Sequence, residues 1–204
     1  MSELALFPLP VVLFPDSALP LHIFEERYRI LIAGCITSPS EFGINLVHEG
    51  KMSEVGCTAV VEKLVKKYDD GKMDIVVRGK RRYRLMQVAP ESREYMVGEV
   101  EYLALEGGSV DRALAQETIR LHNTVIDIVY NDSNRHIPID LVATGISFAL
   151  AQKSGMDLLQ RQHLLEVTSE NERLKLLSTY FTGIIPKLET MEEVNRVARS
   201  DGYL

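Results

Sequence analysis

The chain has 204 residues, of which 46% are hydrophobic and 25% are charged. This composition supplies enough apolar side chains for a core and argues against disorder. The formal net charge of −6 argues against a surface built as a whole to neutralise a polyanion, and no apolar run approaches the roughly 18 residues of a membrane-spanning helix. We therefore expect a globular protein without a membrane partner.

The N-terminal segment and the cysteines indicate the compartment. Residues 4–14 are apolar, but they follow no basic residue and are interrupted by Pro8 and Pro10, so they do not match a secretory signal. Cys35 and Cys57 are too few for a disulfide framework, and neither lies near a second thiol or a histidine at metal-ligand spacing. A reducing, cytoplasmic setting is expected.

The first half of the chain has the pattern of a β-structure. It holds nine of the 13 glycines and six of the eight prolines within residues 1–108. Alternating apolar and β-branched residues predict strands at 42–46, 58–67, 83–88 and 97–103. Asp70-Gly71 predicts a type I′ hairpin turn, which would return Met73, Ile75 and Val77 on one face of the following strand.

One helix is expected within this β-region. Phe24, Tyr28 and Leu31 begin an apolar face that continues through Ile32 and Cys35, at helical spacing. Glu25 and Arg29 lie four residues apart on the other face. We expect Tyr28 to be packed, and Glu25 or Arg27 to reach the cationic segment around Arg82 and fix the helix against the sheet.

After residue 108 the apolar period becomes helical. Helices are expected at 109–129, 138–155, 156–167 and from 169 onward. Ser109 is the expected N-cap of the first, and Ser169 with Glu172 forms a capping box for the last. Pro186 should kink or end that helix. The change of period predicts a β-part at residues 1–106 and a helical bundle at residues 109–204.

Catalytic motifs are absent from the sequence. Residues 145–149 approach G-x-S-x-G but lack the final glycine, and they fall inside an expected helix. None of the three Gly-Lys pairs completes a phosphate-binding loop, and the five histidines never fall three or four residues apart. We therefore expect no enzyme activity, no cofactor and no metal site.

Residues 78–84 concentrate five cations around Tyr83. Lys80, Arg81 and Arg82 could hold a phosphate backbone while Tyr83 stacks on a base. The favoured interpretation is a charged hairpin or edge strand whose cations repel other strand edges and pair with nearby carboxylates.

Residues 6–24 are almost uncharged and broken by prolines, so they should run as short extended pieces. Exposed apolar side chains there would suit an extended polypeptide. Together with the basic segment, the expected binding residues are Phe14, Pro15, Leu19, Pro20, Phe24, Glu25, Arg27, Tyr28, Lys80, Arg81 and Arg82.

Several motifs, in order, resemble the N-terminal substrate-binding domain of ATP-dependent Lon proteases. They lie at residues 6–10, 13–15, 19–28, 42–44, 56–59, 70–71, 79–85, 162–166 and 172–174. The resemblance covers residues 4–185. It implies an α+β fold in which a PUA-like β-barrel with one inserted helix is followed by a C-terminal helical bundle.

The resemblance implies a recognition role without catalysis, because the ATPase and Ser-Lys protease modules of full Lon enzymes have no counterpart motif in these residues. The expected function is a non-catalytic module that binds unfolded or extended polypeptide, with a protease or a chaperone as a further partner class. An RNA-binding PUA-like module that uses residues 78–84 is the alternative. A hydrolase with a site assembled from distant residues is a third hypothesis. The sequence does not determine the oligomeric state.

Overall fold

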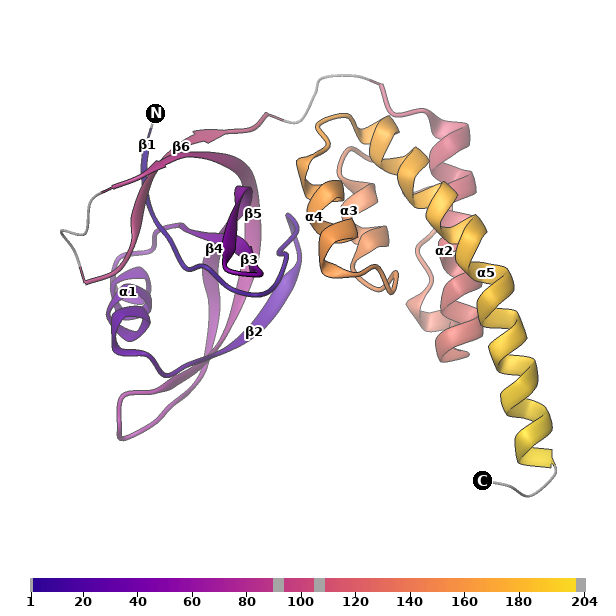
Figure 1. The fold of residues 1–204 in the computed structure, drawn as a ribbon, viewed down its shortest axis with the longest axis horizontal. Coiled ribbons are helices and arrows are strands. Elements are labelled where there is room, and N and C mark those ends of the chain that lie inside the picture. The colour runs from indigo at the N-terminus through magenta and orange to yellow at the C-terminus, as the bar shows by residue number, and fades with distance from the viewer. Residues whose placement is uncertain (1, 90–93, 105–108, 201–204) are drawn as a thin grey trace. The chain divides into compact units, whose positions relative to one another are not determined.

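The computed structural model describes residues 2–89, 94–104 and 109–200, with side chains described as far as residue 194. The chain divides into two compact units, drawn in Figure 1. Met1–Ala104 and Asp157–Glu166 form one, which we call the strand unit, and Leu105–Met156 and Val167–Leu204 form the other, which we call the helical unit. The Gly107-Gly108 boundary expected from the sequence lies outside the described residues.

The strand unit contains a six-stranded sheet whose named strands pair antiparallel. Its strands are β1 (Ser2–Ala5), β2 (Ala18–Ile23), β3 (Phe42–His48), β4 (Lys51–Lys67), β5 (Met73–Val88) and β6 (Val97–Tyr102). They follow the order β1-β6-β5-β4-β3, and β2 pairs with β5. Leu6 and Leu9 form parallel bridges to β3, so the N-terminal segment closes the sheet as the expected barrel. The α+β class is confirmed.

Helix α1 (Glu26–Thr37) packs against this sheet and contributes to its core. The predicted period-two face of β5 is confirmed, because Met73, Ile75 and Val77 are all buried. Tyr28 is also buried as predicted, and its ring stacks on Phe7 with the centroids 3.8 Å apart. The apolar helix face packs into the same cluster through Tyr28, Leu31, Ile32 and Cys35.

The hairpin turns differ from the sequence prediction. Asp70-Gly71 does connect β4 to β5, but only Gly71 has a positive φ (84°), and its N–H donates to the Tyr68 carbonyl. This is a type I turn followed by a left-handed glycine, so the predicted type I′ turn is wrong here. Two positive φ angles occur instead at Glu49 and Gly50, 49° and 75°, between β3 and β4.

Within the barrel, Tyr83 is fully buried and its phenol donates to the Asn45 side-chain oxygen. Two glycines make room for the ring. A Cβ at Gly43 or Gly56 would lie 2.7 Å from Cζ of Tyr83, closer than a carbon contact allows. This neutral pair therefore occupies a space that only glycine neighbours leave open.

The helical unit contains α2 (Arg112–Tyr130), the 3₁₀ turn η1 (Ser133–Arg135), α3 (Ile146–Ala151) and α5 (Glu170–Ser200). Asp111, not Ser109, caps α2 by accepting from the Leu114 N–H. Residues 138–145 form turns where a helix was expected, because left-handed Gly145 sets the start of α3. The Ser169 hydroxyl accepts from Glu172 N as expected. Helix α5 continues past Pro186. The missing N–H of this proline removes one backbone hydrogen bond, in an exposed part of the helix.

Helix α4 (Leu158–Glu166) belongs to the strand unit. Its helical apolar period had predicted that it belongs to the bundle at residues 109–204. Its Gln162 side chain donates to the Val55 carbonyl of β4 at 3.0 Å, and its Leu165 carbonyl accepts from Arg82 at 2.9 Å. These bonds join residues 107 and 83 positions apart, a separation that local periodicity does not report.

Candidate functional site

The predicted apolar segment is only partly at the surface. Phe14 is fully buried, with the Arg161 guanidinium 4.8 Å from its ring centroid, and Pro15 is half-buried. Burial of Arg161 lowers its pKa. The expectation of an exposed Phe14 ring is wrong, because this segment passes beneath other side chains before it reaches β2.

Strand β2 brings the rest of that segment to the surface in an alternating pattern. Leu19 is half-buried and packs on the core, whereas Pro20 is exposed and the Phe24 side chain beyond the strand is 59% exposed. His22 lies between them with its Nδ1 2.6 Å from the Asp74 carboxylate. The hydrogen bonds from His22 and Tyr68 lower the pKa of Asp74. The exposed apolar residues of β2 and the position after it are therefore Ala18, Pro20 and Phe24.

The residues at the start of α1 pair with one another. Arg27 Nη2 lies 2.7 Å from Glu25 Oε2, and the Arg27 guanidinium lies 4.6 Å from the Tyr28 ring centroid. Burial raises the pKa of Tyr28. Arg82 is only 2% exposed and donates to the backbone carbonyls of Leu165 and Ala104. The prediction that Glu25 or Arg27 reaches the cationic segment around Arg82 is therefore wrong, because Glu25 and Arg27 pair with each other.

Three arginines of the basic segment pair with carboxylates, as predicted, but the predicted edge strand is wrong, because β5 lies inside the sheet and pairs with β4, β6 and β2. Arg78 pairs with Glu62 at 2.8 Å, Arg81 with Glu41 at 3.0 Å, and Arg84 with Glu54 at 3.1 Å. Tyr83 is buried, and burial raises its pKa. Tyr83 therefore has no exposed ring face on which a base could stack, and of the predicted trio Lys80 and Arg81 are exposed while Arg82 is not.

A surface that the sequence reasoning missed lies where α1 meets the distal half of β4. Four apolar side chains are exposed there, by 37% to 55%, and they are Ile30, Ile36, Leu64 and Val65. Ile30 and Ile36 lie off the predicted buried face of the helix, which is the signal that could have revealed them. We call this surface the α1–β4 seam.

The seam contains two hollows. One, of about 240 Å³, lies between the end of α1 at Cys35 and Ile36 and the 60–64 segment of β4. The other, of about 280 Å³, lies between the first turns of α1, including Arg29 and Ile30, and the turn at Lys67 and Gly71. The hollows follow one another along the helix, because β4 runs past it in the opposite direction.

The β4 backbone is unpaired along the seam. Strand β3 pairs with β4 only as far as Ala59, opposite Phe42. Beyond that point β5 pairs with β4 on one side, from Val60 to Lys67, and among the described strands none pairs with the other side. The seam thus combines exposed apolar side chains, hollows and a free strand edge.

The serine of the near-match motif at residues 145–149 is held inside the helical unit. Ser147 of the near-match motif is buried, donating to Glu170 at 3.2 Å and accepting from Arg173 Nε at 2.8 Å. Arg173 also pairs directly with Glu170, so this is a buried structural network. Among residues 2–89, 94–104 and 109–200, three or more potential metal-ligating side chains do not cluster. No helix searched there is both long and apolar enough to cross a membrane.

Comparisons with known proteins place this architecture among Lon N-terminal domains. A family model described as the ATP-dependent protease La (LON) substrate-binding domain matches residues 3–182. Lon protease 2 of Syntrophobacter fumaroxidans is 24% identical over 217 residues, which cover 98% of this chain but only 27% of that protein. The chain therefore spans about a quarter of this relative's length.

Two solved structures are similar in fold. The Lon N-terminal domain protein from Xanthomonas campestris gives a TM-score of 0.70 at 25% identity, covering 87% of this chain and 97% of that one. The N-terminal domain of the Mycobacterium avium complex Lon protease gives 0.69 at 20% identity, covering 89% and 98% respectively. The second likeness bears on the fold alone.

Proposed function

Because the chain belongs to the Lon substrate-binding domain family, we propose that it is a non-catalytic module that binds unfolded or extended polypeptide through the α1–β4 seam and the neighbouring Phe24. The observation that carries the proposal is the grouping of exposed Ile30, Ile36, Leu64 and Val65 beside hollows and a free strand edge. Exposed apolar patches of this kind mark binding surfaces more often than isolated apolar side chains do.

The chemistry of the seam suits a chain that has lost its fold. An unfolded polypeptide offers apolar side chains that a folded protein buries, and their transfer from water onto Ile36 or Leu64 is favourable at about 25 cal/mol per Å². Few such contacts form at once, so binding should be weak, and the apolar contribution to it should depend little on salt. A protease or a chaperone that receives the bound polypeptide is the partner class that fits this role, and both buried cysteines are free thiols, which suits the reducing, cytoplasmic setting.

The pairing of the basic segment argues against the RNA-binding alternative. Arg78, Arg81 and Arg84 would each have to give up a carboxylate before holding a phosphate. Binding to RNA would therefore exchange ion pairs instead of adding them, and the repulsion from a chain of net charge −6 would oppose it.

The proposal can be tested with a fluorescently labelled, reduced and carboxymethylated protein that stays unfolded. We expect the double variant Phe24→Ser, Ile36→Ser to bind it about tenfold more weakly, since two partly exposed apolar contacts are lost. Val129→Ser with Met191→Ser is the matched control, because these side chains are 49% and 62% exposed in the helical unit. Equal losses in the two double variants would contradict a site on the seam.

Three further assays complete the experiment: binding of a labelled RNA oligomer, hydrolysis of ATP and cleavage of casein. We expect weak RNA binding that is unchanged in the seam variant, and no hydrolysis of ATP or casein. Tight, salt-sensitive RNA binding that is lost in a Lys80→Ala, Arg81→Ala variant, with no binding of the unfolded protein, would favour the RNA alternative.

A further inference from the structure

We propose that the α1–β4 seam binds its polypeptide as an added β-strand, and that it selects segments in which acidic and apolar residues alternate. This inference rests on the proposed function and specifies the ligand and its geometry at the same seam. It is carried by the free edge of β4, the dimensions of the seam and the unpaired lysines along that edge.

The seam has the dimensions of a short strand. Two register shifts leave Glu62 and Val65 without a partner on β5, so residues 60–67 of β4 lie opposite residues 73–78 and span about 20 Å at roughly 3.3 Å per residue. The 12 residues of α1 span about 18 Å at roughly 1.5 Å per residue. The part of the edge that the helix flanks is therefore long enough for about five or six residues of an extended chain. A helix beside an open strand edge is also the arrangement in which extended peptides are captured by backbone hydrogen bonds.

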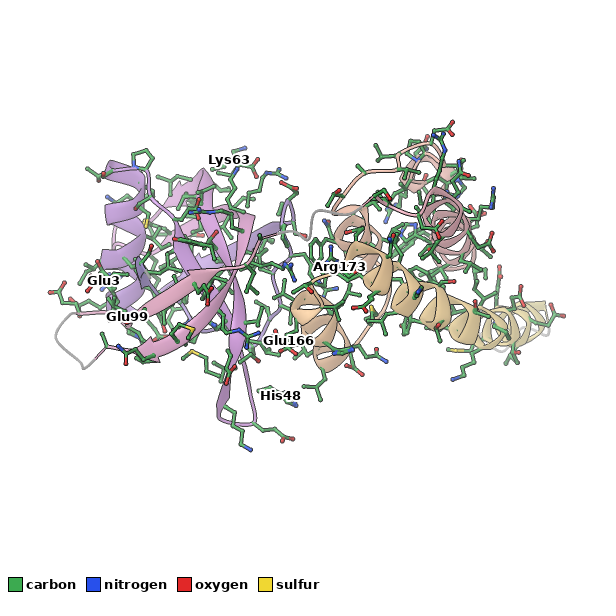
Figure 2. The ribbon with its side chains drawn as sticks, turned by 90° about the horizontal axis from the view of Figure 1, so that it is seen from above. Glu3, His48, Lys63, Glu99, Glu166 and Arg173 are labelled. Carbon is green, nitrogen blue, oxygen red and sulfur yellow. The ribbon has the colours of Figure 1, made fainter. Side chains whose placement is uncertain are left out.

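The register of β4 against β5 sorts its side chains onto two faces. Residues directly opposite one another in an antiparallel pair share a face. Leu64 is opposite buried Ile75, so Leu64 lies on the face that α1 covers. Lys63 and Lys66 are opposite Val76 and Asp74, which are only half-buried, so both lysines lie on the outer face. Figure 2 shows Lys63 at the outside of the strand unit.

The lysines of this edge differ from Arg78, Arg81 and Arg84 of β5 because they have no carboxylate partner within ion-pair distance. Among the described residues, no ion pair within 4.0 Å involves Lys63, Lys66 or Lys67, whereas Arg78 holds the neighbouring Glu62. Lys66 instead lies 4.3 Å from the Tyr68 ring centroid. Three lysines without an ion pair therefore place positive charge along one edge of a chain whose net charge is −6, and only Lys66 of the three lies opposite a carboxylate, that of Asp74.

An added strand would complement both faces at once. Its side chains alternate, so apolar residues at every second position would lie against Ile30, Ile36 and Leu64. The intervening residues would lie beside Lys63 and Lys66, where carboxylates form charge-assisted bonds. Lysines on an edge strand also oppose pairing with the basic edge of another copy. The same side chains that discourage self-association thus favour an acidic partner.

The ligand can be tested with a capped, fluorescent peptide of alternating Glu and Val, six residues long, measured by anisotropy on the full chain. Its counterpart of alternating Lys and Val should bind at least about tenfold more weakly. The double variant Lys63→Glu, Lys66→Glu should bind the acidic peptide more weakly by a similar factor. Lys175→Glu with Lys187→Glu is the matched control, since both are exposed lysines of the helical unit and the net charge changes equally.

The geometry can be tested by N-methylation of the peptide. An added strand presents every second N–H to the β4 edge and the others to water. Methylation of one alternate set should therefore abolish binding, and methylation of the other set should leave it nearly unchanged. Hydrogen exchange should show new protection at residues 62–66 of β4.

The outcomes separate this inference from the proposed function. If both methylated peptides bind like the parent, or if the acidic and basic peptides bind equally, strand addition with acidic selectivity is wrong. Binding of the carboxymethylated unfolded protein that still depends on Phe24 and Ile36 would then leave the proposed function standing. Loss of that dependence as well would overturn both.

Discussion

The helical unit and the strand unit bury their polar side chains differently. The helical unit encloses an ion pair, in which fully buried Arg173 contacts Glu170 and donates to the carbonyls of Val167 and Thr168 at 2.7 and 2.8 Å. The strand unit encloses the neutral pair of Tyr83 and Asn45, and its buried Arg82 donates to the backbone carbonyls of Leu165 and Ala104. Its exposed arginines pair at the surface, and its edge lysines have no carboxylate partner among the described residues.

This difference separates cations that hold the fold from cations that could meet a ligand. A buried charge must be satisfied inside the protein, so Arg173 has no freedom to bind anything else. A surface arginine with a carboxylate partner contributes little to stability and is already occupied. Only a cation that is both exposed and unpaired offers its charge to a partner. Local density of positive charge in the sequence therefore does not identify the ligand-binding cations.

The largest expected effect is on the buried ion pair. Arg173→Met should lower the free energy of unfolding of the helical unit by about 3–5 kcal/mol, because buried Glu170 loses its ion-pair partner and keeps only the hydrogen bonds from Gly145 and Ser147. Urea unfolding followed by circular dichroism at helical wavelengths measures this, since the chain has no tryptophan.

Two further variants control this measurement. Arg120→Met, which removes the exposed pair with Glu117, should cost less than about 1 kcal/mol. Replacing both buried partners, Arg173→Met with Glu170→Leu, should recover part of the loss. A single Arg173→Met variant as stable as the Arg120→Met variant would show that the buried pair does not hold this unit together.

The neutral pair of the strand unit should cost less to break. Tyr83→Phe removes the phenol that donates to Asn45 and leaves a buried amide oxygen with one partner fewer, at about 1–3 kcal/mol. Tyr102→Phe is the control, because Tyr102 is half-buried on β6, and its change should stay within about 0.5 kcal/mol. An effect of Tyr83→Phe larger than that of Arg173→Met would reverse the comparison of the two units.

Much of the strand unit could be predicted because its signals are local. The period-two face of Met73, Ile75 and Val77 and the buried face of α1 follow from which side chains share a side of a strand or helix. The type I′ turn was misplaced because Asp-Gly also fits a type I turn with a left-handed glycine. The Ser109 cap was wrong because Asp111, two residues later, is an equally good capping residue.

The predictions that were wrong concern features set by contacts between residues far apart in the sequence. The burial of Phe14 and Arg82, and the packing of α4 on β4, are set by residues far along the chain. The candidate site was missed for a related reason. The free edge of β4 exists only because β3 stops pairing at Ala59, and a strand's own sequence does not record where its neighbour ends.

A smaller effect is expected when pH changes, through His122 in the helical unit. Its ring is 2% exposed beside Phe181, and burial lowers its pKa from 6.5. The unfolded chain therefore binds the proton first, so the contribution of neutral His122 to stability is full above pH 6.5 and is lost as pH falls below it. Unfolding by urea across this range should show a weaker pH dependence in His122→Gln than in the parent. The exposed His163→Gln is the control, and identical slopes in all three proteins would contradict the assignment.

The smallest effect is expected at the paired arginines of β5, and it sharpens the distinction between occupied and available cations. Arg84 contacts Glu54, a carboxylate that is 74% exposed, at 3.1 Å, so Arg84→Ala should change the free energy of unfolding by less than about 0.5 kcal/mol. It should also leave binding of the alternating Glu-Val peptide unchanged, because Arg84 lies outside the seam. Lys63→Ala should likewise leave stability unchanged but weaken peptide binding about threefold, as the loss of one surface charge contact implies. Peptide binding to the two variants, measured by anisotropy, compares the loss of a paired cation, Arg84 of β5, with the loss of an unpaired cation, Lys63 of the adjacent strand β4. Weaker binding in Arg84→Ala than in Lys63→Ala would mean that a carboxylate partner does not keep a cation from its ligand.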